Sequence, residues 1–329
     1  MPRKRVAVAM SGGVDSSWAA ALLKEDGYEV IGVTMQLLPR YATGLDRFGG
    51  CCGLEAIEAA RQVAHKLDIS HYVMNFRDIF SQRVITDFCQ EYSLGRTPNP
   101  CILCNQYIKF DRLLQRIREL GADFLATGHY ARIEHSPNGY RLLKAVDPTK
   151  DQSYFLYTLG QEELQHLLFP IGNFHKAEVR KLSTRLGLPT ADRRDSQDIC
   201  FIPDNDYRSF VARHIPLRPG DITDTTGNFL GRHTGLAQYT VGQRQGLGLS
   251  SNERLYVLNL DTTNNRLVVG TRDQLLGNKL TVSQLTWVSG QAPKEPNSLT
   301  AKIRYRSPEA AAKIRIADIL GFLIRYLLA

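Results

Sequence analysis

The chain has 329 residues, and 43% of them are apolar, which is enough for a folded core and excludes wholesale disorder. At roughly 100–200 residues per domain, this length allows two or three domains. Lys and Arg outnumber Asp and Glu by 41 to 33, and the net charge of +8 suits a polyanionic partner such as nucleic acid as readily as plain solubility. The 6 cysteines are too sparse for a disulfide scaffold, and no apolar run is long enough for a secretory signal or a membrane span. We therefore expect a cytoplasmic protein that does not enter membranes.

Apolar runs and helical periodicity alternate through the first part of the chain. The pattern predicts buried strands at 6–9, 30–33, 71–76 and 124–127 and helices at about 16–25, 54–67, 79–92 and 108–120. Strands that alternate with helices are typical of a parallel sheet with helices on its faces. We therefore predict an α/β fold with a doubly wound parallel sheet.

The pattern changes after Ala131. Pro137-Asn138-Gly139 between two alternating runs predicts a hairpin over 132–146, and a helix over 176–186 ends at Gly187. Beyond Pro203 the chain is rich in Gly, Thr and Asn, and a second hairpin is expected over 255–270. We predict three domains, an α/β domain at 1–203, a small central domain at 204–275 and a β-rich C-terminal segment at 276–329.

A glycine-rich loop, Ser11-Gly12-Gly13-Val14-Asp15-Ser16-Ser17, lies between the first strand and the first helix, at the edge where open α/β sheets bind ligands. Its glycines let the backbone approach an anion, and the helix N–H groups and serine hydroxyls supply donors. Asp15 would repel a phosphate, so the role that suits it is holding Mg²⁺ beside one. A capped glycine turn would explain Ser-Gly-Gly but not the Asp-Ser-Ser that follows, and the Gly-Lys-Ser/Thr ending of a Walker loop is absent.

This loop resembles the pyrophosphate loop of the ATP pyrophosphatase (PP-loop) superfamily, whose members cleave ATP between the α and β phosphates and adenylate a carbonyl oxygen. By itself the loop does not choose among amidotransferases, argininosuccinate synthetase and tRNA-modifying members.

The cysteines carry further information. Cys101 and Cys104 stand three positions apart before a predicted helix, so they could form half of a zinc site, a redox pair, or a nucleophile with its neighbour. Cys51 and Cys52 are adjacent, which is the wrong spacing for the second half of a zinc site. Cys200 lies 200 − 104 = 96 residues beyond Cys104, so the two can meet only through the fold, and Cys200 could equally be a small buried apolar residue.

Several motifs in one order resemble the tRNA-specific 2-thiouridylases of the MnmA type over nearly the whole chain. The runs that carry the resemblance are Ser11–Ser17, Gly95–Pro100, Cys104-Asn105 with Ile108-Lys109-Phe110, Ala126–Arg132, Lys150–Leu156, Ile199-Cys200-Phe201 and Gly242–Gly248. Amidotransferases and argininosuccinate synthetase share only the first of these. The resemblance implies a PP-loop ATP pyrophosphatase domain at 1–203, then a small linker domain and a C-terminal β-barrel.

The resemblance also implies a role for each matched residue. Cys104 is the expected nucleophile and Cys200 the persulfide carrier, with Asp15 also catalytic and a Cys104–Cys200 disulfide formed during turnover. The expected ATP-binding residues are Ala9, Met10, Ser11, Gly12, Gly13, Val14, Asp15, Ser16, Met35 and Gly128. The target base is expected at Asn99, Pro100 and Cys101, and tRNA at His129, Lys150, Asp151, Gln152, Arg304 and Tyr305. Each of two of these residues has an alternative to tRNA contact. His129 could be a partly buried histidine whose hydrogen bonds are satisfied within the protein, and Lys150 could be a solvated cation in a loop.

The implied activity is 2-thiolation of the wobble uridine of tRNA. ATP with Mg²⁺ adenylates the C2 oxygen so that AMP can leave, and sulfur arrives as a persulfide from a cysteine desulfurase or a sulfur-relay protein. The terminal sulfur attacks C2 directly, or Cys104 frees hydrosulfide from Cys200, and either route ends in the disulfide. We expect the protein to act as a monomer. The rival hypothesis from another class is a protein that binds ATP and tRNA without turnover.

Two features depart from the family pattern. Well-known members carry Asp at the position of Cys101, so Cys101, Cys104 and Cys200 could instead hold an iron–sulfur cluster whose remaining iron carries the hydrosulfide. From about Glu309 the resemblance fades, and 314–329 looks like an apolar, helix-capable run. We therefore expect the C-terminal barrel to be incomplete, truncated or altered after about residue 308.

Overall fold

A computed structural model describes residues 3–38, 53–193, 195, 199–202, 206–292, 298–317 and 321–326. The chain divides into two compact units, and each is considered by itself. The first comprises Met1–Val84, Cys101–Pro203 and Leu285–Lys294, and the second comprises Ile85–Pro100, Asp204–Gln284 and Glu295–Ala329. These two units do not test the boundaries of the three predicted domains, which stay predictions.

The first unit is built on a parallel sheet of five strands in the order β3-β2-β1-β4-β7. Its strands are β1 (Arg5–Ala9), β2 (Glu29–Gln36), β3 (Ser70–Asn75), β4 (Phe124–Thr127) and β7 (Leu167–Leu168). The chain runs outward from β1 to β3 and then returns to β4 beside β1, so right-handed crossovers place helices on both faces. The predicted α/β class with a doubly wound parallel sheet is therefore confirmed.

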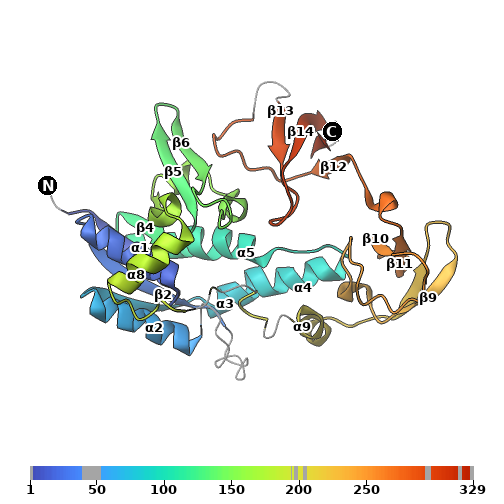
Figure 1. The fold of residues 1–329 in the computed structure, drawn as a ribbon, viewed down its shortest axis with the longest axis horizontal. Coiled ribbons are helices and arrows are strands. Elements are labelled where there is room, and N and C mark those ends of the chain that lie inside the picture. Colours follow the sequence, from blue (N-terminus) through green and yellow to red (C-terminus); the bar gives the residue numbers. More distant parts are fainter. Residues whose placement is uncertain are drawn as a thin grey trace. The chain divides into compact units, whose positions relative to one another are not determined.

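The helices of this unit pack on the sheet through apolar faces. Its main helices are α1 (Val14–Glu25), α2 (Leu54–Lys66), α3 (Arg77–Phe80), α5 (Pro100–Leu103), α6 (Leu114–Glu119), α7 (Gln161–Leu164) and α8 (Lys176–Arg185). Alternate residues of β1, Val6 and Val8, join Trp18 of α1 and Val63 of α2 in one buried cluster. Helices α1 and α8 lie side by side (Figure 1), which brings the start of α8 close to the start of α1. The hairpin β5 (Ala131–Ser136) and β6 (Gly139–Lys144) follows β4, as predicted.

Two of the predicted helices contain π-helical turns. The helix predicted over 79–92 consists of α3, a π-helical segment Ser81–Ile85 and α4 (Thr86–Ser93), and the one over 108–120 begins with a π-helical segment, Cys104–Leu113. A π turn inserts one extra residue and often marks a functional position. The second segment begins at Cys104 itself.

The second unit contains two sheets. Strands β8 (Gly220–Thr223), β9 (Phe229–His233), β10 (Tyr256–Asp261) and β11 (Arg266–Gly270) form a sheet in the order β10-β11-β8-β9, in which β10 and β11 make the predicted hairpin. Val257, Leu267 and Val269 are fully buried in its core. Helices α4 and α9 (Tyr207–His214) contact one another through a stacked Tyr92–Tyr207 pair with ring centroids 5.4 Å apart.

Residues 314–317 and 321–326 form strands, so the helix-capable interpretation of 314–329 is wrong for these residues. Strands β12 (Lys279–Val282), β13 (Ser298–Ala301), β14 (Ala310–Ala317) and β15 (Gly321–Tyr326) make an antiparallel sheet in the order β12-β15-β14-β13. Strand β15 pairs with both β12 and β14. An apolar run with no clear period fits a buried strand as well as a helix, and here pairing with β12 decides the outcome. Among the described residues, no helix has the length and apolar character needed to cross a membrane.

Candidate functional site

The glycine-rich loop has a backbone that tolerates no side chain at its second residue. Gly12 has φ +69°, and a Cβ atom there would lie 2.3 Å from the carbonyl oxygen of Ala56. The Oγ of Ser16 accepts a hydrogen bond from the Ser11 N–H at 3.1 Å, and the Oγ of Ser17 donates to the Gly13 carbonyl at 2.8 Å. The loop is thus closed tightly over the first turn of α1, where helix N–H groups can face an anion.

Gly128, at the end of β4, lies directly against this helix start. A Cβ atom at Gly128 would be 2.7 Å from the backbone nitrogen of Ser16, so only glycine allows the approach. The predicted ATP-binding residues Ala9, Met10, Val14 and Met35 are all buried around the same edge, at the carboxyl ends of β1 and β2 or in the first turn of α1. The structure therefore brings the predicted ATP-binding set together at one edge of the sheet.

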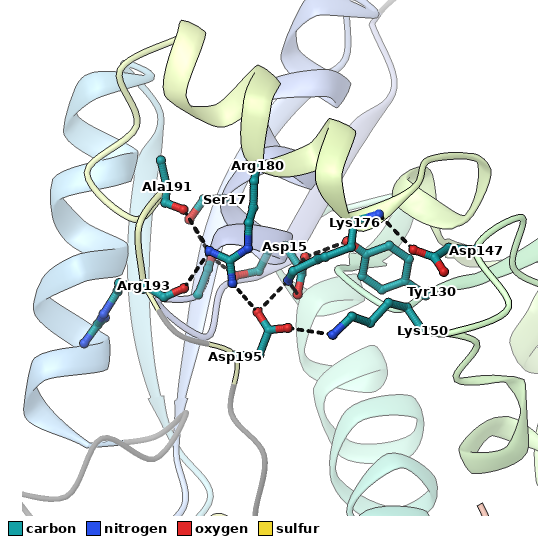
Figure 2. Close-up of polar contacts among 12 residues, drawn as sticks. Asp15, Ser17, Tyr130, Asp147, Lys150, Lys176, Arg180, Ala191, Arg193 and Asp195 are labelled. Carbon is teal, nitrogen blue, oxygen red and sulfur yellow. Dashed lines mark hydrogen bonds and ion pairs between the residues drawn. The ribbon is translucent and has the colours of Figure 1, made fainter. Parts of the chain in front are cut away.

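The carboxylate of Asp15 is already paired. Lys176 Nζ, at the first residue of α8, lies 2.7 Å from both of its oxygens, and the Tyr130 hydroxyl donates to Oδ1 at 2.8 Å (Figure 2). The Lys176 side chain is only 10% exposed. Burial, together with the negative charge of Asp15, raises the pKa of Tyr130 well above its usual value, so its hydroxyl stays protonated and donates.

A second carboxylate, that of Asp195, forms ion pairs with three cationic side chains. It accepts hydrogen bonds or ion pairs from Lys150 at 2.8 Å, Lys176 at 2.9 Å and Arg180 at 2.7 Å (Figure 2). Burial by itself would raise the pKa of Asp195, but the hydrogen bonds from Lys150 and Lys176 outweigh it and lower that pKa to about 2. Asp195 is therefore ionised throughout the neutral range.

Two arginines attach Ala191 and Arg193 to the rest of the site. Arg180 Nη1 donates to the carbonyls of Ala191 and Arg193, at 3.1 and 3.0 Å. Arg193 Nη1 donates in turn to the Gly12 carbonyl at 2.9 Å. Residues 191–193 are thus bonded both to α8 and to the glycine-rich loop.

Asp147 fixes the start of α8. Its Oδ2 accepts the backbone N–H of Lys176 at 3.0 Å, while its Oδ1 accepts the N–H and hydroxyl of Thr149. Burial opposes ionisation of Asp147, but these hydrogen bonds, the one from the Lys176 backbone first, prevail and lower its pKa. The Lys176 side chain is therefore aimed from a fixed backbone position.

All four predicted tRNA contacts in the first unit have their side chains engaged within the protein. His129 is buried between Phe110 and Phe169 and shares a 2.6 Å hydrogen bond with Thr127, and burial together with the charge of Lys109 lowers its pKa well below 6.5. The Asp151 carboxylate accepts from the backbone N–H groups of Ala145 and Ser153, and from the Ser153 hydroxyl. Contacts between these side chains and tRNA stay predictions.

Gln152 and Lys150 contact different residues. Gln152 Oε1 accepts the Tyr130 N–H at 2.9 Å, and the Gln152 N–H donates to the Tyr130 carbonyl at 2.8 Å, so Gln152 supports the residue that holds Asp15. Lys150, by contrast, is part exposed and reaches Asp195. Lys150 thus joins the same ion-pair cluster as Lys176, through Asp195.

The cysteines occupy three different environments. Cys101 is exposed on α5, Cys104 is buried at the start of its π-helical segment, and Cys200 is half-buried. Its neighbour Phe201 is 2% exposed and packs edge-on against Phe80, with ring centroids 5.7 Å apart. Among the described residues, no three His, Cys, Asp or Glu side chains gather as metal ligands, so the cysteines do not fit the cluster hypothesis in this conformation.

The remaining predicted residues lie in the second unit. Asn99 and Pro100 end its segment Ile85–Pro100, and Pro100 is buried. Arg304 is exposed and its Nη2 donates to the Val241 carbonyl at 2.9 Å, while Lys302 lies over the Tyr305 ring at 5.4 Å. Nothing in this arrangement tests their contact with base or tRNA, so those roles stay predictions.

The sequence-based prediction missed Lys176, Arg180, Tyr130 and Asp195. A signal existed for each. Tyr130 and Asp195 lie in or beside runs that carry the family resemblance, and Lys176 and Arg180 are four residues apart at the start of a predicted helix, hence on one face. What the sequence lacks is any sign that this face meets the glycine-rich loop.

Comparison with known proteins gives family matches along most of the chain. Family models match as a tRNA methyl transferase HUP domain at residues 4–204, a tRNA methyl transferase PRC-barrel domain at 208–271 and an aminomethyltransferase beta-barrel domain at 277–325. The last match runs to residue 325, which corrects the expectation that the family resemblance ends near Glu309.

Curated relatives agree with these models. The chain is 49% identical to tRNA-specific 2-thiouridylase MnmA 1 of Caldanaerobacter subterraneus subsp. tengcongensis over 98% of its own length and 90% of the relative's. It is 52% identical to MnmA of Geotalea uraniireducens, over 92% of this chain and 82% of that protein. A solved structure of a predicted subunit of tRNA methyltransferase from Methanocaldococcus jannaschii aligns with 55% of this chain and 76% of its own, at 18% identity and a TM-score of 0.34. The chain belongs to the MnmA family of tRNA-specific 2-thiouridylases.

Proposed function

We propose that this protein is an ATP-dependent tRNA sulfurtransferase that replaces the C2 oxygen of the wobble uridine with sulfur. The observation that carries the proposal is the family match along the chain, joined to a glycine-rich loop that closes on the N-terminal turn of α1. As a PP-loop enzyme it uses ATP, and the reaction would release AMP and pyrophosphate.

The residues at the sheet edge suit the phosphates of ATP. Gly12 lets the loop pack directly on the backbone of Ala56, and Gly128 lets β4 end directly against the start of α1. The first turn of α1 supplies N–H donors. We assign Lys176 and Arg180 as further phosphate contacts, since Lys176 pairs with Asp15 of the loop and Arg180 pairs with Asp195, which Lys176 also contacts. These cations would stabilise the charge that grows on the phosphates as the α–β bond breaks.

Mg²⁺ would bind beside the phosphates at Asp15, a carboxylate of the kind that Mg²⁺ prefers. When bound, it would neutralise phosphate charge. In this structure Lys176 occupies both Asp15 oxygens, so the ammonium must shift for Asp15 to take that role. The Tyr130 hydroxyl can keep the carboxylate oriented during the exchange.

The chemistry would take two stages. The C2 oxygen attacks the α phosphorus of ATP, a P–O bond breaks and pyrophosphate leaves. Sulfur then attacks C2 and the C2–O bond breaks, so the oxygen departs with AMP. Asn99, Pro100 and Cys101 would line the base during both stages, with Lys150, Asp151, Gln152, His129, Arg304 and Tyr305 at the tRNA.

Sulfur would come from a persulfide on Cys200, and Cys104 would act as the nucleophile. The Cys104 thiolate attacks the Sγ atom of Cys200, which breaks the persulfide S–S bond and frees the terminal sulfur for C2. The product disulfide joins Cys104 and Cys200, and an external thiol must reduce it. A cysteine desulfurase or a sulfur-relay protein is the donor we propose, and the enzyme would act as a monomer in the cytoplasm.

The iron–sulfur alternative, with Cys101, Cys104 and Cys200 as ligands, differs only in how the sulfur arrives. The described residues do not gather three such ligands, so we derive no step through a cluster. The two routes are separated by the cysteine variants considered in the Discussion.

The test is a reconstitution with purified protein, tRNA, ATP, Mg²⁺ and a persulfide donor. We expect AMP, pyrophosphate and 2-thiouridine at the wobble position in equal amounts, with the modified nucleoside identified by mass spectrometry. ATP and tRNA binding without any of these products would favour the rival hypothesis of a binding protein.

A further inference from the structure

A second glycine-rich loop, in the second unit, has no role in the proposed function. It spans residues 240–248 and contains the run Gly242–Gly248, one of those that carry the family resemblance. The loop is attached to β10, because the Gly242 N–H donates to the Val257 carbonyl at 2.8 Å. Its backbone is therefore fixed on the sheet of this unit.

Two arginines from other segments lie against glycines of this loop. Arg208, in α9, places Nη1 and Nη2 3.2 Å from the point where a Cβ atom of Gly246 would lie. Arg304 places Nη1 3.9 Å from the corresponding point at Gly242, and its Nη2 donates to a carbonyl of the loop at 2.9 Å. Arg244 is exposed and lies between the two glycines in the chain. Three guanidinium groups are therefore carried by one short loop or packed on it.

These three guanidinium groups are not neutralised within the described part of the protein. Among the described residues, no carboxylate forms an ion pair with Arg208, Arg244 or Arg304. The carboxylate of Asp206, two positions before Arg208, instead accepts the Ser209 N–H at 3.0 Å as the cap of α9. Like charges repel one another, so a group of cations on one loop favours an anionic ligand.

The same loop offers backbone donors. Within the part of the chain that the structure describes, the N–H groups of residues 244–248 donate to no backbone or side-chain acceptor. Consecutive backbone N–H groups bind anions in proteins, and a guanidinium group can bind two oxygens of one phosphate. Residues 240–248 include no acidic residue. The loop and its arginines therefore present a donor set that suits phosphate.

The loop lies beside the segment that is expected to hold the target base. A Cβ atom at Gly95 would lie 3.2 Å from the Cβ of Leu260 in β10, and the Thr97 hydroxyl lies 3.5 Å from that of Thr240. Asn99, which is expected at the base, follows Thr97 by two positions, and all of these residues belong to the second unit.

We propose that the 240–248 loop, together with Arg208 and Arg304, binds backbone phosphates of the anticodon stem-loop of tRNA. Arg304 is already expected at the tRNA, whereas Arg208, Arg244 and the N–H groups of the loop are new contacts. Contacts to phosphate fix the position of a nucleic acid and read no sequence, so the loop holds the anticodon arm while other residues recognise the base. This inference rests on the proposed function, because its ligand is the tRNA substrate.

The experiment measures binding of unmodified tRNA, and of an RNA that contains only its anticodon stem-loop, to the full-length protein. Fluorescence anisotropy gives the affinity at several NaCl concentrations from low to physiological. Arg208→Gln and Arg244→Gln each remove one guanidinium group, and Arg244→Lys keeps the charge. Arg232→Gln is the matched control, since Arg232 is an exposed arginine of the same unit that pairs with Asp221 at 3.4 Å. Circular dichroism checks that each variant is folded.

We expect each of Arg208→Gln and Arg244→Gln to weaken binding of both RNAs about fivefold at the lowest salt. The slope of log affinity against log salt should fall by about 0.7 to 0.9 for each arginine, because one phosphate contact is lost. Arg244→Lys should keep the wild-type slope, and Arg232→Gln should match the wild type. In thiolation assays Arg208→Gln and Arg244→Gln should raise the KM for tRNA without raising the KM for ATP.

An Arg244→Gln variant with the affinity and the slope of the wild type would overturn the inference, and this result can be read even if Arg208→Gln does not fold. A loss that is seen with tRNA but not with the stem-loop, or an equal loss in Arg232→Gln, would also overturn it. If the wild type neither binds nor thiolates tRNA, the proposed function fails together with the inference. If the wild type thiolates tRNA and Arg244→Gln binds it equally well, only the inference fails.

Discussion

Lys176 Nζ lies 2.7 Å from both carboxylate oxygens of Asp15, although the two residues are 161 positions apart in the chain. The pair joins the first turn of α1 to the first turn of α8, and the Tyr130 ring lies 5.8 Å from the ammonium. The Lys176 side chain is 10% exposed, and burying a charged group is costly unless a group of opposite charge pairs with it. The pair therefore holds a cation ready at the place where phosphate is expected.

Replacing that cation should impair ATP use more than it impairs folding. We expect Lys176→Met to lower kcat/KM for ATP on the order of 10²-fold, because a preorganised charge at the breaking phosphate bond is lost. Lys181→Met, which removes an exposed lysine of the same helix, should leave the rate unchanged. Steady-state release of pyrophosphate measures both variants, and a Lys176→Met enzyme with wild-type kinetics would remove Lys176 from the phosphate site.

Substitutions at Asp15 and at Tyr130 should reduce thiolation to different extents. Asp15→Asn is expected to abolish thiolation while circular dichroism stays native, because the proposed Mg²⁺ ligand is gone. Tyr130→Phe keeps the ring beneath Lys176 and removes only the hydroxyl that orients Asp15, so a loss of a few fold is expected. Near-normal thiolation by Asp15→Asn would contradict the assignment of the ATP site.

Asp195 should contribute stability that disappears in acid. Its pKa is about 2 in the folded protein against 3.8 for the ordinary side chain, so its contribution is present above pH 4 and is lost as the pH falls through 2. This shift corresponds to about 2 kcal/mol. The free energy of unfolding of the wild type should exceed that of Asp195→Asn by roughly this amount at pH 6, and the difference should shrink below about 0.5 kcal/mol at pH 2. A difference that does not change with pH would mean that the Asp195 ion pairs do not stabilise the fold.

The parallel sheet was predictable because its signals are local. The apolar run at 6–9, the glycine-rich turn and the helix ending before Gly27 each lie within a few residues, and Gly27 does adopt a positive φ of +86°. The ionic cluster was not predictable, because Asp15, Lys150, Lys176 and Asp195 come from four separate segments. A charged side chain in a sequence gives no sign of which charge it will meet.

The C-terminal strands and the burial of His129 also depend on residues that are distant in the sequence. Residues 314–317 and 321–326 form strands because β15 is bracketed by β12 and β14, and β12 lies far back in the chain. His129 lies in a motif that implies tRNA contact, but the apolar rings of Phe110 and Phe169 surround it. A motif gives the residue type, whereas burial depends on residues outside the motif.

If Lys150 contacts a tRNA phosphate as predicted, it contributes to the salt dependence of tRNA affinity. Each phosphate neutralised by a lysine adds about 0.9 to the slope of log affinity against log salt. Lys150→Gln should therefore weaken tRNA binding and reduce that slope by about one. Titrations between low and physiological salt measure it, with Lys181→Gln as the control. An unchanged slope would leave Lys150 as a partner of Asp195 alone.

The three cysteines decide how the sulfur arrives. Under the persulfide route Cys104 and Cys200 are both needed, while Cys101, which is exposed, does no chemistry. Cys101→Asp should then keep substantial activity in air, whereas Cys104→Ser and Cys200→Ser should have none.

Under the cluster route the three thiolates are equivalent ligands, so Cys101→Ser, Cys104→Ser and Cys200→Ser should lose iron and activity together. Anaerobic iron and sulfide analysis with a visible spectrum gives a readout that does not depend on activity. Thiolation assays with a persulfide donor and no added sulfide complete the comparison. A Cys200→Ser enzyme that is active under those conditions would defeat the persulfide route, because no other step in it can carry the sulfur to C2.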